Sequence, residues 1–114
     1  TGGIAAYKAI QLARDLTQLG AAVDVVLSAG ARDFVQPLSF EALTGRPVYT
    51  EPYLPGDPLL HIRLAREAEA VIVAPATANF LARAAAGLAD DLLAALLLAT
   101  AAPVLLCPAM NDGM

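Results

Sequence analysis

Residues 70–79 read Ala-Val-Ile-Val-Ala-Pro-Ala-Thr-Ala-Asn, and this stretch decides the fold class. Its first half is an apolar run with three β-branched residues at its centre, and Pro75 closes the run. A short run that is apolar throughout is typical of a strand buried inside a parallel sheet. Thr77 and Asn79 would then lie beyond the carboxyl end of that strand, which is where open parallel sheets bind ligands.

Helix and strand patterns alternate on both sides of this run. Apolar, β-branched composition predicts further strands at residues 23–27, 48–50 and 104–107. Apolar spacing and terminal residues predict helices at residues 4–19, 39–44, 79–86 and 91–101. Residues 51–58 hold three prolines and a glycine and predict a loop, whereas residues 61–69 fit either a helix or an extended start.

Residues at the ends of the predicted helices refine the helix boundaries. Ser39 and Asp90 are expected to cap the helices that they open, and Gly45 and Gly87 to end helices. Strands that alternate with helices and are apolar throughout predict an α/β fold, with a parallel sheet covered on both faces. The first helix opens at Gly2-Gly3, an entrance that normally follows a strand, so we expect a first strand before Thr1.

The length, hydrophobic content and net charge of the chain limit the number of domains and the kinds of partner that we expect. The 114 residues suit one domain, and 58% of them are hydrophobic while 16% are charged. Such a chain has apolar surface left to bury against copies of itself. The net charge of −4, with no Lys/Arg cluster, argues against nucleic acid and against anionic membranes as partners.

Two further features concern location. The uncharged apolar run at residues 92–99 is too short to cross a bilayer and predicts a buried helix, followed by a buried strand. Cys107 is the one cysteine, so no disulfide framework exists, and with no signal peptide visible we expect a cytoplasmic protein.

Four loops are predicted at one edge of the sheet. They share small or neutral hydrogen-bonding residues and contain no Lys or Arg, and they comprise residues 2–3, 28–30, 75–79 and 108–111. Backbone N–H groups and hydroxyls at such positions suit a phosphate, and small residues leave room for a flat ring. A nucleotide or flavin site is one interpretation, and simple helix capping by Ser28 and Thr77 is the other.

Two polar side chains are candidates for chemistry. His61 is the only histidine, and because imidazole ordinarily titrates near neutral pH it is the natural proton-transfer group. A lone histidine is also often structural, and no metal-spaced partner accompanies it, so no metal site is expected. Asn111 follows the last strand, where its amide fits either a bound carboxylate or a loop cap.

Five motifs together resemble the homo-oligomeric flavin-containing cysteine decarboxylases, over essentially the whole chain. They occur in that family's order, at residues 2–8 (Gly-Gly-Ile-Ala-Ala-Tyr-Lys), 61–64 (His-Ile-x-Leu), 74–79 (Ala-Pro-Ala-Thr-Ala-Asn), 87–93 (Gly-Leu-Ala-Asp-Asp-Leu-Leu) and 108–114 (Pro-Ala-Met-Asn-x-x-Met). The Pro-Ala-Met-Asn motif is the most specific. The chain resembles in particular the branch that acts on 4'-phosphopantothenoylcysteine.

The resemblance implies a Rossmann-like, flavodoxin-type αβα fold, trimers, and FMN at the subunit contact. It assigns FMN contacts by position to Gly2, Gly3, Ile4, Ser28, Phe34, Thr77, Ala78, Asn79, Phe80 and Ala109. It makes His61 the catalytic residue and Asn111 the group that binds the substrate's carboxylate. Residues 1–114 would form one flavoprotein domain, truncated at both ends.

The implied reaction is FMN-dependent decarboxylation of 4'-phosphopantothenoylcysteine to 4'-phosphopantetheine in coenzyme A biosynthesis, within a bifunctional protein that also carries a ligase domain. Two alternatives remain, namely a peptidyl-cysteine decarboxylase and a non-catalytic flavin-binding subunit on the same fold. A dinucleotide-binding domain ranks behind both because Gly-x-Gly-x-x-Gly is missing.

Overall fold

The computed structural model describes all residues, 1–114. In chain order its elements are α1 (Ala6–Gln18), β1 (Val25–Val26), the short 3₁₀ helix η1 (Gly30–Asp33), α2 (Pro37–Thr44), β2 (Val48–Tyr49), α3 (Leu60–Glu67), β3 (Val71–Ala76), α4 (Ala78–Ala85), α5 (Leu92–Ala99) and β4 (Val104–Pro108). The alternation of strands and helices predicted from the sequence is confirmed, and the fold is α/β.

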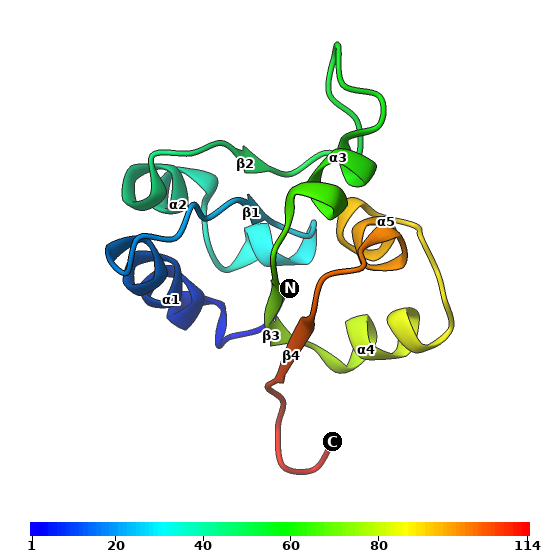
Figure 1. The fold of residues 1–114 in the computed structure, drawn as a ribbon. Coiled ribbons are helices and arrows are strands. Elements are labelled where there is room, and N and C mark those ends of the chain that lie inside the picture. The colour runs from blue at the N-terminus through cyan, green and yellow to red at the C-terminus, as the bar shows by residue number, and fades with distance from the viewer.

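All strand pairs are parallel, as predicted. β1 pairs with β2, and β3 pairs with β4, so the strands form two two-stranded ladders. In the second ladder Val71 lies opposite Val104, and the register shifts between Val73 and Ala76, around a cis peptide bond before Pro75. Helices surround both ladders, with α1 and α2 beside β1 and β2, and α4 and α5 beside β3 and β4 (Figure 1).

Two regions of the core hold these layers together. One joins α1 to the β1 side of the molecule, where Ala6 and Ala13 pack with Leu27 and Phe40. Next to it, α3 and α5 pack on one another and on residues of both ladders, Tyr49 of β2 and Val71 of β3, and Leu60 of α3 is fully buried there. Burying a leucine side chain contributes about 1.5–3 kcal/mol, so this packing fixes the position of α3.

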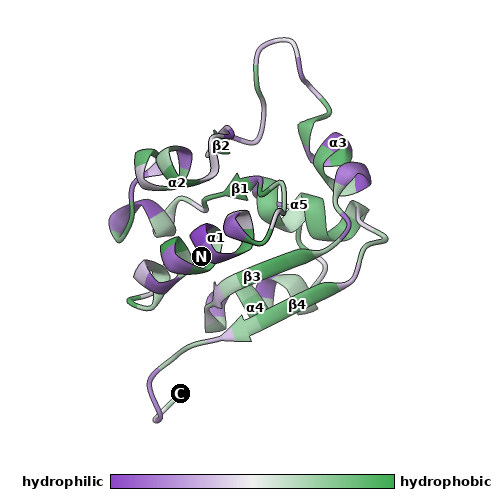
Figure 2. Cartoon of the chain, turned by 60° about the vertical axis from the view of Figure 1, so that its left-hand side comes forward, coloured by the Kyte–Doolittle hydropathy of each residue, from purple (hydrophilic) through white to green (hydrophobic).

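The last strand differs from its prediction. Residues 104–107 were expected to be buried, but Val104, Leu105 and Leu106 of β4 are 41%, 58% and 39% exposed. β4 pairs with β3 on one side only, so it lies at the edge of its ladder. Figure 2 shows β4 as an apolar ribbon at the margin of the molecule.

Two predicted caps are wrong. Asp91, not Asp90, caps α5, because its carboxylate accepts a hydrogen bond of 2.8 Å from the backbone N–H of Ala94. Asp90 instead accepts a hydrogen bond from Arg83, which holds the pKa of the Asp90 carboxyl below its ordinary range. Ser39 lies inside α2, which starts at Pro37 without a side-chain cap.

Other local predictions are confirmed. Gly45 and Gly87 follow helices with φ of 65° and 70°, a left-handed conformation that glycine adopts without strain. The ambiguous residues 61–69 contain most of helix α3. The short helix η1 had no predicted counterpart in the sequence. None of the helices has the length and apolar character needed to span a membrane.

The corrected cap gives a direct stability test. We expect Asp91→Ala to lower the free energy of unfolding by about 1 kcal/mol, because the N–H of Ala94 loses its acceptor. Asp90→Ala is the matched control and should have a smaller effect, since Asp90 is exposed and pairs only with Arg83. Urea unfolding measures both, and a larger loss for Asp90→Ala would contradict the assignment.

Candidate functional site

Three loops meet at the carboxyl ends of β1 and β3. Gly2 lies against Gly30, so closely that a Cβ atom on Gly2 would come within 2.6 Å of the Gly30 carbonyl carbon. Gly3 faces the next loop, where a Cβ atom would lie 3.6 Å from Cγ2 of Thr77. The segment at the start of the chain therefore connects the end of one ladder to the end of the other.

Hydrogen bonds bring the remaining strand end to the same place. The Thr1 hydroxyl donates to the carbonyl of Pro75 and accepts a 3.1 Å bond from the N–H of Thr77. Ala109, which follows β4, donates its N–H to the carbonyl of Ala76 at 3.3 Å. The predicted convergence of four strand-end loops is confirmed by these contacts.

Several backbone donors at this edge have no acceptor within the chain. The N–H groups of Ile4 and Ala5, at the start of α1, make no hydrogen bond, and the same holds for Ala29 and Gly30 after β1. A helix start with free N–H groups favours an anion. Because Gly2 and Gly30 approach without side chains between them, the backbone itself forms the wall of this region.

Two hydroxyls are partly committed to the loops that carry them. Ser28 accepts a hydrogen bond of 3.2 Å from the N–H of Ala31, and Thr77 accepts one of 3.1 Å from Phe80 at the start of α4. Each therefore acts as a local cap, as the simpler interpretation held. Each hydroxyl proton stays available to a ligand. The donor set thus fits a phosphate-bearing ligand, with neutral loops beside it for a flat ring.

The side chain of Phe80 is fully buried with Val73, Ala76 and Leu93, so it packs beneath the loop. Its contact with FMN stays a prediction. Ala78 and Asn79 follow Thr77 at the start of α4, and their backbone N–H groups have no acceptor within the chain.

Phe34 and Ile4 are exposed at this edge. Phe34 follows η1 and is 51% exposed, and Ile4 is 83% exposed. Apolar side chains with so much free surface are suited to pack against a ligand or another protein chain.

Asn111 lies two residues beyond Ala109, in the exposed segment after β4. Its side-chain oxygen accepts a 2.9 Å hydrogen bond from the N–H of Gly113, so the amide caps its own loop. The side-chain NH₂ group has no acceptor within the chain and can donate to a carboxylate.

His61 does not join these loops within a single chain. It is the second residue of α3, and both views place α3 beside the starts of β3 and β4, whereas the candidate site lies where these strands end (Figures 1 and 2). The half-buried imidazole has no hydrogen-bond partner within the chain.

Gly30 belongs to the predicted loop 28–30, but no sequence signal singled it out as a site residue. Its only signal was its position directly after Ser28 and Ala29, at the end of a predicted strand. The contact with Gly2 depends on two segments distant in the sequence, so neither glycine alone reveals it.

Comparison with known proteins agrees with this geometry. The family model described as "Flavoprotein" matches residues 1–114. The chain belongs to the flavoprotein family. The coenzyme A biosynthesis bifunctional protein CoaBC of Vibrio cholerae is 48% identical over the full chain, and that of Mycolicibacterium smegmatis is 50% identical over 99% of it. The chain spans 29% and 27% of the length of these two relatives.

Solved structures of this flavoprotein family give the same fold. The FMN-dependent cysteine decarboxylase SpaF superposes with a TM-score of 0.89 at 34% identity, covering 98% of this chain and 66% of SpaF. A PPC decarboxylase variant complexed with pantothenoylaminoethenethiol superposes at 0.82 with 32% identity, covering 97% and 64%. The Rossmann-like architecture expected from the sequence is thereby confirmed.

The two neighbouring glycines make a matched pair for testing the site's construction. We expect Gly2→Ala to lower the free energy of unfolding by about 1–3 kcal/mol, because the new methyl group collides with the Gly30 backbone. Gly3→Ala should have little effect, since its Cβ would make ordinary contacts with Thr77 and Pro75. Equal losses in urea unfolding would contradict the close approach.

Proposed function

We propose that this chain is the FMN-binding domain of an enzyme that decarboxylates 4'-phosphopantothenoylcysteine to 4'-phosphopantetheine in coenzyme A biosynthesis. The observation that carries the proposal is the convergence of neutral loops with free N–H donors at the strand ends. The names of the CoaBC relatives, at about half identity across the chain, supply the pathway. Those relatives are bifunctional, so we propose that the same protein also carries a ligase domain. We also propose a cytoplasmic location.

Different residues of the chain would bind the phosphate and the ring of FMN. Gly2 and Ile4 would hold the phosphate through backbone N–H groups, together with the hydroxyl of Ser28. Gly3, whose own N–H donates to the Thr1 carbonyl, would let the backbone come close to the phosphate. The flavin ring would lie along Thr77, Ala78, Asn79 and Ala109, with Phe34 packing beside it. When bound, FMN supplies the hydride acceptor that oxidises the substrate's cysteine.

Two side chains would act on the substrate. Asn111 would hold the cysteine carboxylate through its free NH₂ group, which orients the carboxylate for loss of carbon dioxide. His61 would exchange protons with the reacting groups. Because α3, which carries His61, lies beside the starts of β3 and β4, we propose that His61 enters the site of a neighbouring subunit in a trimer.

A second candidate is decarboxylation of a peptidyl cysteine. It is favoured by the structural likeness to the FMN-dependent cysteine decarboxylases SpaF and TvaF, the latter from thioviridamide biosynthesis, with TM-scores of 0.89 and 0.90. Identity to those proteins is 34% and 32%, lower than to the CoaBC proteins, which ranks it second. A non-catalytic flavin-binding subunit ranks third because His61 and Asn111 are both present.

Substitution of the histidine separates catalysis from flavin binding. We expect His61→Asn to keep its FMN, measured by visible absorbance, and to lose at least about a hundredfold in decarboxylation of 4'-phosphopantothenoylcysteine. The product is measured as released carbon dioxide. Unchanged turnover would favour the non-catalytic reading, and turnover of a cysteine-terminated peptide alone would favour the second candidate.

Mixing two inactive variants tests whether a site uses two subunits. His61→Asn and Asn111→Ala subunits, refolded together in equal amounts, should regain about a quarter of wild-type activity, because random mixing restores that share of sites. Each variant refolded alone is the control. A mixture as inactive as its components, with the oligomer formed, would contradict completion of the site across subunits.

A further inference from the structure

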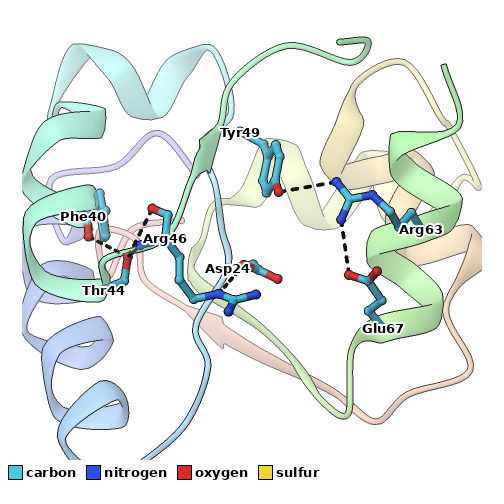
Figure 3. A network of polar contacts seen from close by, with 7 residues as sticks. All are labelled: Asp24, Phe40, Thr44, Arg46, Tyr49, Arg63 and Glu67. Atoms are coloured by element: carbon cyan, nitrogen blue, oxygen red, sulfur yellow. Dashed lines mark hydrogen bonds and ion pairs between the residues drawn. The ribbon is translucent and has the colours of Figure 1, made fainter. Parts of the chain in front are cut away.

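Arg63 is the centre of a polar network that joins three parts of the chain. It lies in α3 and donates from Nη2 to the hydroxyl of Tyr49 in β2 at 3.4 Å, with its guanidinium 5.9 Å from the centre of the Tyr49 ring. Its Nη1 donates to Glu67 one turn further along α3 at 3.3 Å (Figure 3). The remaining partner is Asp57, which belongs to neither element.

Asp57 makes the closest contact of this network. One of its carboxylate oxygens accepts from Nε of Arg63 at 3.0 Å and lies 2.9 Å from Nη2. Asp57 lies near the end of the proline-rich segment before α3, and its N–H donates to the carbonyl of Leu54 at 3.0 Å. This carboxylate therefore fastens the loop to the helix.

The Asp57–Arg63 ion pair joins residues on either side of His61 in the sequence. Asp57 precedes His61 by four residues and Arg63 follows it by two, so the ion pair closes a short segment around the histidine. The start of α3 has no side-chain cap, because Leu59 stands at the N-cap position and is 61% exposed. Leu60 is fully buried and fixes the helix on the core, but the exposed backbone before it has no other side-chain anchor.

We propose that Asp57 and Arg63 are positioning residues for His61, holding the start of α3 in the orientation in which the imidazole meets the substrate of a neighbouring subunit. The inference rests on the proposed function, because it assigns His61 to catalysis. An error of about 1 Å in such a group costs up to about a hundredfold in rate. Loss of the pair should therefore slow turnover without changing how FMN or substrate binds.

The chain offers matched controls for this pair. Asp24 accepts from Arg46 at 2.8 Å, and the exposures of these side chains, 26% and 43%, resemble those of Asp57 and Arg63, 29% and 39%. Figure 3 shows the Asp24–Arg46 pair in the same view, outside α3. Glu67 is the second control, since it binds the same Arg63 without touching the loop.

The test measures kcat, KM and bound FMN in the complete natural protein that carries this chain. Asp57→Asn should lower kcat about tenfold, with KM, FMN content and thermal midpoint as in Asp24→Asn, whereas Glu67→Gln and Asp24→Asn should keep kcat within about twofold of wild type. A kcat for Asp57→Asn equal to that of Asp24→Asn would overturn the proposal.

A double-mutant cycle and a conservative variant exclude a general loss of structure. Asp57→Asn combined with Arg63→Met should be no slower than the slower single variant, because each removes the same contact. Arg63→Lys keeps the charge but not the two-donor fork, and its kcat should lie between those of wild type and Arg63→Met. Additive losses, or no rescue by lysine, would overturn the proposal.

The same measurements separate this inference from the proposed function. Wild type without decarboxylase activity, or His61→Asn with full activity, contradicts the proposed function itself. Active wild type and inactive His61→Asn, with Asp57→Asn as fast as its controls, contradict only the positioning role.

Discussion

The close approach of two backbone segments at Gly2 and Gly30 is the constraint on which the site depends. With no side chain between them, the loop at the start of the chain reaches the end of β1 on one side and Thr77 on the other. That contact places free N–H groups from separate loops along one edge. The proposed phosphate site is built from backbone geometry, and such a site needs no lysine or arginine.

Different kinds of contact support the two halves of the proposed site. At the strand ends, the hydroxyls of Ser28 and Thr77 cap local turns and Phe80 packs beneath the Thr77 loop, so the loops proposed to bind flavin rest on the core. Around His61, support comes from a half-exposed network of charged groups centred on Arg63. A buried core tolerates little movement, whereas an exposed ion pair is individually weak. We therefore expect substitutions near α3 to affect turnover before they affect flavin binding.

Local signals in the sequence predicted most of the fold. Apolar runs located β3 and β4, and Gly45 and Gly87 ended helices because each adopts a positive φ. Predictions failed where a tertiary partner decided the outcome. Asp90 and Asp91 are equivalent as sequence signals, and Arg83 at the end of the preceding helix contacts both. Only the backbone path into α5 puts Asp91 at the N-cap position, where its carboxylate reaches the N–H of Ala94.

The same contrast between local signals and tertiary contacts applies to the candidate site. Convergence of the loops was predictable because parallel strands share an edge, but the burial of Phe80 depends on how α4 packs on β3. The position of His61 relative to the loops depends on the path of the proline-rich segment and on how α3 packs on the core, which no local pattern encodes. The contribution of Gly30 required the distant partner Gly2.

The central claim is that the strand-end loops bind the phosphate of FMN through backbone donors. Calorimetric titration of the flavin-free protein with FMN and with riboflavin, which lacks the phosphate, tests it most directly. Two or more charge-assisted hydrogen bonds predict binding of FMN at least about a hundredfold tighter than that of riboflavin. Equal affinities for the two flavins would contradict the account.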